Sequence, residues 1–113
     1  MAEPQLIVQI PFAGAGDYDR LIAVEESLIQ AFAQRNPFAE VDGHDAGQGR
    51  FNIFIRPLGT WGPVLDRVEV VLKLRGILKE SLVVKRLKSE KYVVVWPKEH
   101  TGAFELSQET PSK

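Results

Sequence analysis

The 113-residue sequence predicts an α+β fold in which two helices pack on one face of an antiparallel sheet. Five short segments are rich in β-branched and aromatic residues, and two longer segments repeat apolar residues at helical spacing. Their order is strand, helix, strand, strand, helix, strand, strand, which is typical of a two-layer sandwich. A chain of this length and average composition fits a single domain.

The first strand is expected over residues 5–11, because its β-forming residues end at Pro11, which cannot donate a hydrogen bond to a neighbouring strand. After a glycine-containing loop, a helix is expected over residues 18–35. Its apolar residues recur every three or four positions: Leu21, Val24, Leu28, Ile29 and Phe32. An Asn-Pro pair should end this helix. Glu25 lies in its middle, where it either faces solvent or borders the core, and the sequence does not decide between the two.

A hairpin should follow the first helix. Its first strand is expected over residues 39–46, at a sheet edge or with a bulge, because this stretch contains glycine and aspartate. Its second strand, residues 50–56, alternates most regularly. Phe51, Ile53 and Ile55 should therefore face the core, and the opposite face should carry Arg50, Asn52, Phe54 and Arg56. Gly47 or Gly49 should adopt a positive φ in the turn.

The second helix should follow Thr60, with Pro63 in its first turn, where the missing N–H is not needed. Gly76 stands where a left-handed C-terminal cap would end it. The last two strands are expected over residues 82–87 and 92–96, joined by a polar turn.

The complete β-α-β-β-α-β-β order is a ferredoxin-like pattern with one added strand. We expect residues 1–97 to form this single domain and residues 98–113 to form a C-terminal tail that is partly docked or frayed.

A sheet with both helices on one face leaves its other face open, so what covers the open face bears on function. The strand pattern places a set of aromatic and polar residues there: Gln9, Asn52, Phe54, Arg56 and Trp96. Such a mix is typical of protein interfaces. It predicts that the chain binds another protein, or a second copy of itself as a homodimer.

The segment 40–49 invites a different interpretation, because it holds three acidic residues, three glycines and one of the two histidines. Asp42, His44 and Asp45 could bind a divalent metal, or a carboxylate could orient the imidazole for acid–base chemistry. Adjacent strand residues point to opposite faces, however, so His44 and Asp45 diverge unless a bulge intervenes. We therefore assign no catalytic residue and no metal ligand, and group these three residues with the partner-binding set.

The alternative function is a small enzyme or ligand-binding protein with its site around Asp42, His44, Asn52 and Arg56. A closed pocket lined by these side chains would favour it, and a flat exposed patch would favour a binding module.

Residues 67–91 hold eight basic and three acidic groups, and nearby Tyr92 and Trp96 could stack on bases, so RNA binding is a third possibility. It is not favoured, because the net charge is −1 and the strand over residues 50–56 offers only one exposed aromatic residue, Phe54.

The chain contains no cysteine, which excludes disulfides and cysteine-based zinc sites and suits a reducing cytoplasm. No segment is predicted to enter a membrane. No cofactor is predicted, because neither the dinucleotide fingerprint nor the P-loop is complete after the glycines near residue 15.

Residues 41–55 and the later Tyr92–Pro97 segment resemble small bacterial ferredoxin-like proteins of unknown function. The shared features are a D-G-H-D-x-G-x-G-x-x-N-I-F hairpin and a Y-x-V-x-W-P segment. The resemblance implies a bacterial origin and brings no catalytic residue with it. By analogy it favours a non-catalytic regulator or an immunity-type inhibitor that acts by binding.

Overall fold

The computed structural model describes residues 4–12 and 14–97. Its elements, in chain order, are β1 (Gln5–Pro11), α1 (Ala15–Phe32), β2 (Ala39–Gly47), β3 (Arg50–Pro57), α2 (Trp61–Leu74), the short 3-10 helix η1 (Leu78–Glu80), β4 (Leu82–Arg86) and β5 (Tyr92–Trp96). The predicted α+β class, with two α-helices and a five-stranded antiparallel sheet, is confirmed, and η1 is an addition. The tail predicted over residues 98–113 lies outside the described residues.

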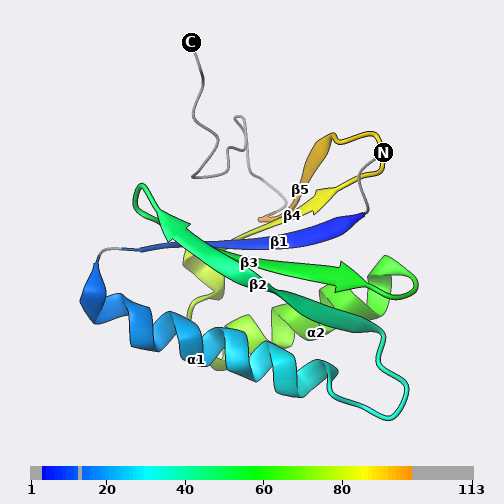
Figure 1. Cartoon of the computed structure of the whole chain (residues 1–113), viewed down its shortest axis with the longest axis horizontal. Coiled ribbons are helices and arrows are strands. Elements are labelled where there is room, and N and C mark those ends of the chain that lie inside the picture. Colours follow the sequence, from blue (N-terminus) through cyan, green and yellow to red (C-terminus); the bar gives the residue numbers. More distant parts are fainter. Residues whose placement is uncertain (1–3, 13, 98–113) are drawn as a thin grey trace.

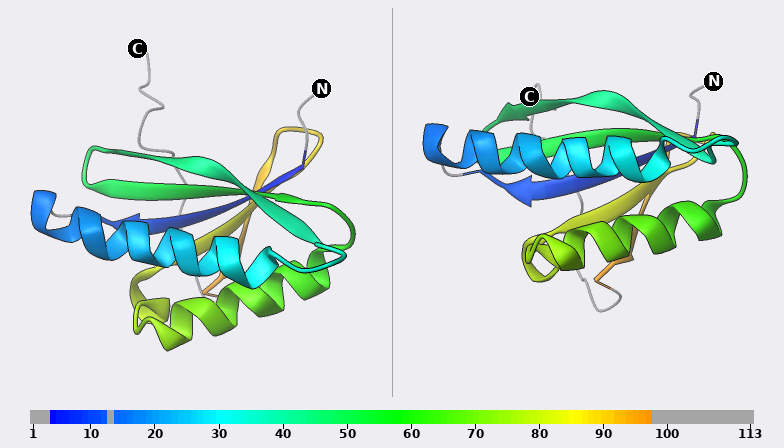
Figure 2. Two further views of the ribbon diagram at one scale, coloured as in Figure 1. Left: turned by 60° about the horizontal axis from the view of Figure 1, so that its bottom comes forward. Right: turned by 90° about the horizontal axis from the view of Figure 1, so that it is seen from below.

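The strands form one antiparallel sheet in the order β2-β3-β1-β4-β5. Both α-helices lie on the same face of this sheet (Figures 1 and 2). The central strand β1 is therefore covered by helices on one side, while the other side of the sheet has no helix on it among the described residues. We call the first side the helix face and the second side the open face.

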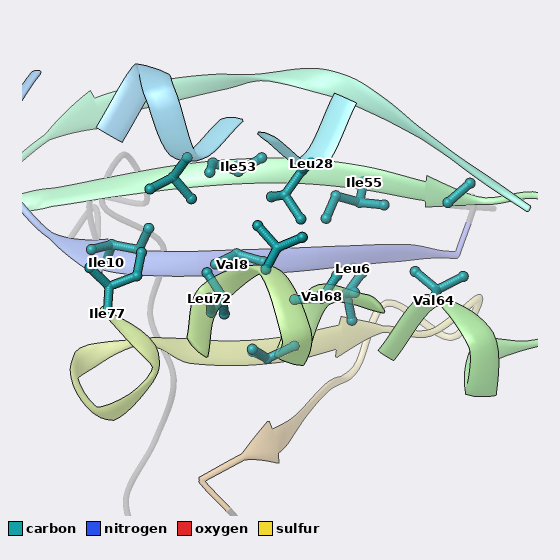
Figure 3. Packing of buried hydrophobic residues seen from close by; sticks show 14 of the residues in the cluster. Leu6, Val8, Ile10, Leu28, Ile53, Ile55, Val64, Val68, Leu72 and Ile77 are labelled. Atoms are coloured by element: carbon teal, nitrogen blue, oxygen red, sulfur yellow. The ribbon is translucent and has the colours of Figure 1, made fainter. Parts of the chain in front are cut away.

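The main hydrophobic core fills the space between the helix face and the two helices (Figure 3). Alternate residues of β1 and β3 supply its floor, as the sequence pattern predicts, and none of them is exposed: Leu6, Val8, Ile10, Phe51, Ile53 and Ile55. The two helices supply the opposite side of the core with these buried residues: Leu21, Val24, Leu28, Val64, Val68 and Leu72.

The first helix begins and ends three residues earlier than predicted. Gly14, at φ 151°, precedes its first turn, and its carbonyl accepts a hydrogen bond from the Asp17 N–H at 2.9 Å. At the other end, the Phe32 ring packs edge-on against Phe38, with 5.6 Å between the ring centroids. The helix therefore ends before the Asn36-Pro37 pair, and the loop that follows brings Phe38 against its last residue.

The β2–β3 hairpin closes through a two-residue turn. Gly47 pairs with Arg50, and the two residues between them have positive φ: Gln48 at 53° and Gly49 at 79°. Positive φ at both positions is the type I′ geometry that matches the right-handed twist of the strands. The prediction of a positive φ is thus confirmed for Gly49. The other turn residue with a positive φ is Gln48, and Gly47 has no positive φ.

Both edge strands carry a bulge. In β2 the pairing with β3 shifts between Val41 and Gly43, which confirms the predicted irregularity. In β5 the pairing with β4 shifts so that Val95 is an extra residue between Val94 and Trp96. An extra residue in a strand rotates everything beyond it to the other face of the sheet. These two shifts decide which side chains reach each face.

Candidate functional site

The open face carries a hydrophobic cluster of its own. Ile7 and Val84 lie at its centre and have no exposed surface. Four partly exposed side chains surround them: Phe54, Leu82, Tyr92 and Val94. The cluster crosses four adjacent strands, because β3, β1, β4 and β5 each contribute at least one of these residues. An exposed sheet face with this much apolar surface is a candidate contact surface.

A row of three polar side chains runs beside this cluster, across β1, β3 and β2. Gln9 Nε2 donates to Asn52 Oδ1 at 2.9 Å, and Asn52 Nδ2 donates to Asp45 Oδ1 at 2.9 Å. Asn52 has no exposed surface, and Gln9 is only 6% exposed. Because buried amides hold their orientation when they are hydrogen-bonded on both sides, this row is a fixed polar structure next to the apolar cluster, and Asp45 is its partly exposed end.

Charged residues lie at both ends of β3 on the open face. Arg56 donates to the Glu40 carboxylate across the β2–β3 ladder. At the other end, a hollow of about 290 Å³ is lined by Gln9, Pro11, Gly49, Arg50, Glu80 and Leu82. The face therefore combines an apolar centre, a fixed polar row and a charged hollow.

His44 lies on the helix face, beneath α1, and not on the open face. Its Nδ1 is 2.8 Å from Glu25 Oε1, and its Nε2 is 3.2 Å from the Tyr18 hydroxyl. The Glu25 side chain is 10% exposed and the His44 side chain 26%. Because the carboxylate can only accept, Nδ1 carries the proton of this hydrogen bond. Glu25 thus borders the core, which settles the alternative that the sequence left open.

Two aromatic rings contact the histidine, and a third packs against both of them. The imidazole stacks on Phe51 with 4.9 Å between ring centroids. Tyr18 meets both rings edge-on, at 6.0 Å from His44 and 6.1 Å from Phe51, and Phe12 closes the group at 6.2 Å from Phe51. Edge-to-face and stacked pairs of this kind stabilise a packed arrangement. His44 therefore joins the start of α1 to the β2–β3 hairpin.

The predicted partner-binding residues divide between the two faces. Asp45, Asn52, Phe54 and Arg56 share the open face. The other three do not form one group with them. Asp42 is exposed at the bulge of β2, His44 pairs with core residue Ile53 on the helix face, and Trp96 packs against the main core.

The expected place of Trp96 on the open face is therefore wrong. The extra residue Val95 brings Trp96 opposite Val83, which belongs to the helix face. There the indole N–H donates to the Leu78 carbonyl at 3.1 Å. Tyr92, before the bulge, stays on the open face, so the two aromatic residues considered for RNA stacking lie on opposite sides of the sheet.

The four residues of the alternative site are likewise not brought together, since His44 and Asn52 point to opposite faces. The hollow in the open face, the one between α2 and the β4–β5 hairpin, and two others formed by described residues are not lined by Asp42, His44, Asn52 or Arg56. Within the described residues, no three side chains of His, Asp or Glu are grouped as metal ligands.

Sequence reasoning missed the roles of Tyr18 and Glu25. A signal for Glu25 was present, because it lies four residues after Leu21 and three before Leu28, on the buried stripe of α1. A carboxylate on a buried stripe needs a hydrogen-bonding partner. The sequence offers no such signal for Tyr18, which is 40% exposed.

No helix in residues 4–12 and 14–97 has the length and apolar character needed to cross a membrane. Comparison of the chain with protein-family models, with curated proteins and with solved structures found no match. The geometry of the open face is therefore the basis for a functional proposal.

Proposed function

We propose that this chain is a non-catalytic protein-binding module of ferredoxin-like fold, and that it contacts its partner through the open face. The strand order β2-β3-β1-β4-β5 supports the ferredoxin-like assignment, with β5 as the added edge strand. We also propose a cytoplasmic setting, since the chain has no cysteine.

The observation that carries the proposal is the apolar cluster beside the fixed polar row. Energetically important interface residues are often aromatic side chains surrounded by polar groups that exclude water. Phe54 fits this description, because it is partly exposed at the edge of the apolar cluster and follows Asn52 by two residues on the same face of β3. A partner that covers Phe54 also meets the partly exposed Asp45 carboxylate, which the buried Asn52 amide holds in place.

The arrangement of His44 supports the non-catalytic part of the proposal. Each ring nitrogen lies within hydrogen-bonding distance of another side chain, Glu25 on one side and Tyr18 on the other. A general base needs a nitrogen that reaches its substrate. The stacking on Phe51 gives His44 a structural role that requires no substrate.

Site-specific photo-cross-linking tests the proposal and requires no candidate partner. Phe54 is replaced by p-benzoylphenylalanine, and the full chain is irradiated in cells of its source organism. Val70 serves as the matched control, because it is an aliphatic residue on the outer side of α2 and is 50% exposed. We expect one defined cross-linked product from position 54 and none from position 70.

Peptide sequencing of the cross-linked product by mass spectrometry identifies the partner. A toxin-like partner would make the chain an immunity-type inhibitor, and a product of twice the chain mass would make it a homodimer. The same pattern of products from both positions, or no product from position 54, would contradict the proposal.

A further inference from the structure

A second surface lies on the helix face, between α2 and the β4–β5 hairpin. A hollow of about 290 Å³ opens there, and most of its lining is apolar: Leu65, Val68, Leu78, Val83, Val95 and Trp96. None of these residues belongs to the open-face cluster. The hollow is therefore separate from the surface proposed above.

The wall of the hollow is fixed before any ligand arrives. The Trp96 indole N–H donates to the Leu78 carbonyl at 3.1 Å, which holds the ring against η1. The bulge at Val95 turns both Val95 and Trp96 toward α2. A site with a fixed wall loses little side-chain entropy on binding.

Two acidic residues of α2, Asp66 and Glu69, complete the lining of the hollow. They are three residues apart, so they are neighbours on one side of the helix. Among the described residues, neither side chain has a hydrogen-bond or ion-pair partner. Lys85, two residues after Val83 in β4, lies over the Trp61 ring, 5.1 Å from its centroid. Within residues 4–12 and 14–97, the rim of this apolar hollow is therefore negative and has no ion pair that neutralises it.

We propose that this groove binds an extended segment of a partner protein that inserts one apolar side chain and pairs an adjacent Lys or Arg with Asp66 and Glu69. The size of the hollow favours a single anchor side chain, because small-molecule pockets typically measure about 300–1,000 Å³. The negative rim selects a basic neighbour to the anchor. This site goes beyond the proposed function, since it uses the opposite side of the sheet.

Three capped pentapeptides test the site: Gly-Lys-Leu-Lys-Gly, Gly-Glu-Leu-Glu-Gly and Gly-Lys-Gly-Lys-Gly. Each is titrated into the full-length 15N-labelled chain while the backbone amides and the Trp96 indole N–H are followed by NMR. We expect the first peptide to shift the Trp96 indole and Val95 signals in a saturable manner. The peptides without basic residues or without the anchor should bind at least ten-fold more weakly.

The double variant Asp66→Asn, Glu69→Gln should reduce the affinity for the first peptide by about ten-fold, because it removes both charges and keeps the side-chain size. Glu26→Gln, an exposed acidic residue of α1, is the matched control and should leave the affinity unchanged. Phe54→Ala should also leave it unchanged, which separates this site from the open face.

Several results would overturn the groove proposal. The first is no saturable shift of the Trp96 indole at millimolar peptide. The others are equal binding of the acidic peptide, or full binding by the double variant. A shift confined to open-face residues would also overturn it. None of these outcomes bears on the cross-linking result at position 54.

Discussion

Glu25 and His44 form a hydrogen bond between α1 and β2, with 2.8 Å between Oε1 and Nδ1. They are 19 positions apart in sequence, and the Glu25 carboxylate is nine-tenths buried. The pair connects the first helix to the hairpin that carries Asp45 and Asn52. It therefore supports the geometry of the open face from the other side of the sheet.

Glu25→Ala should lower the free energy of unfolding by roughly 1–3 kcal/mol, because it removes the buried partner of His44. Chemical denaturation measures this change. Glu26→Ala, at the exposed neighbouring position, is the control and should change stability by less than about 0.5 kcal/mol. In a double-mutant cycle with His44→Ala, a coupling energy below about 0.5 kcal/mol would show that the pair contributes nothing of its own.

Gly49→Val should destabilise the fold by more than about 1 kcal/mol, because Gly49 has φ 79° and a β-branched residue is strained there. Gly47→Val is a close control. Gly47 has no positive φ, and a Cβ added there meets nothing within 4 Å. Thermal melting of the two variants should separate them clearly. Equal melting temperatures would contradict the type I′ turn.

Phe51→Ala should cost about 3–5 kcal/mol, because Phe51 is fully buried and stacks on His44. Phe54→Ala, three residues later on the other face, should cost less, since Phe54 is partly exposed. Urea denaturation of both variants gives the comparison. A larger loss for Phe54 than for Phe51 would mean that the register of β3 is reversed.

Asn52→Ala should lower stability by roughly 1–3 kcal/mol, because it leaves Gln9 and Asp45 without their shared partner. Asp45→Ala should cost less, since Asp45 lies at the partly exposed end of the row. Hydrogen exchange at the Gln9 side-chain amide provides a local readout, which should speed up in Asn52→Ala. Unchanged exchange would show that the row is not a fixed structure.

The register of β3 could be predicted from the sequence, because its core-facing positions are all apolar and alternate with mostly polar ones. Phe51 faces the core and Asn52 the open face, as that pattern requires. The same argument from alternation predicted the wrong face for Trp96. Tyr92, Val94 and Trp96 would share a face in a regular strand, but the extra residue Val95 moves Trp96 to the other side.

His44 shows the same effect in β2. A regular strand with Ala39 and Val41 facing the helices would place His44 on the open face and Asp45 toward the core. The bulge after Val41 exchanges them, so His44 meets Glu25 and Asp45 meets Asn52. The sequence could indicate a bulge in this glycine-containing segment. Its exact position, and therefore the face of each side chain, depends on packing against α1.

The affinity of the purified chain for its cross-linked partner tests the central claim most directly. Isothermal titration calorimetry would compare the wild type with Phe54→Ala and with the control Val70→Ala, after melting curves confirm that both variants fold. Binding through the open face predicts that Phe54→Ala weakens the affinity at least ten-fold, or about 1.4 kcal/mol, and that Val70→Ala leaves it unchanged. Wild-type affinity in Phe54→Ala would contradict the claim.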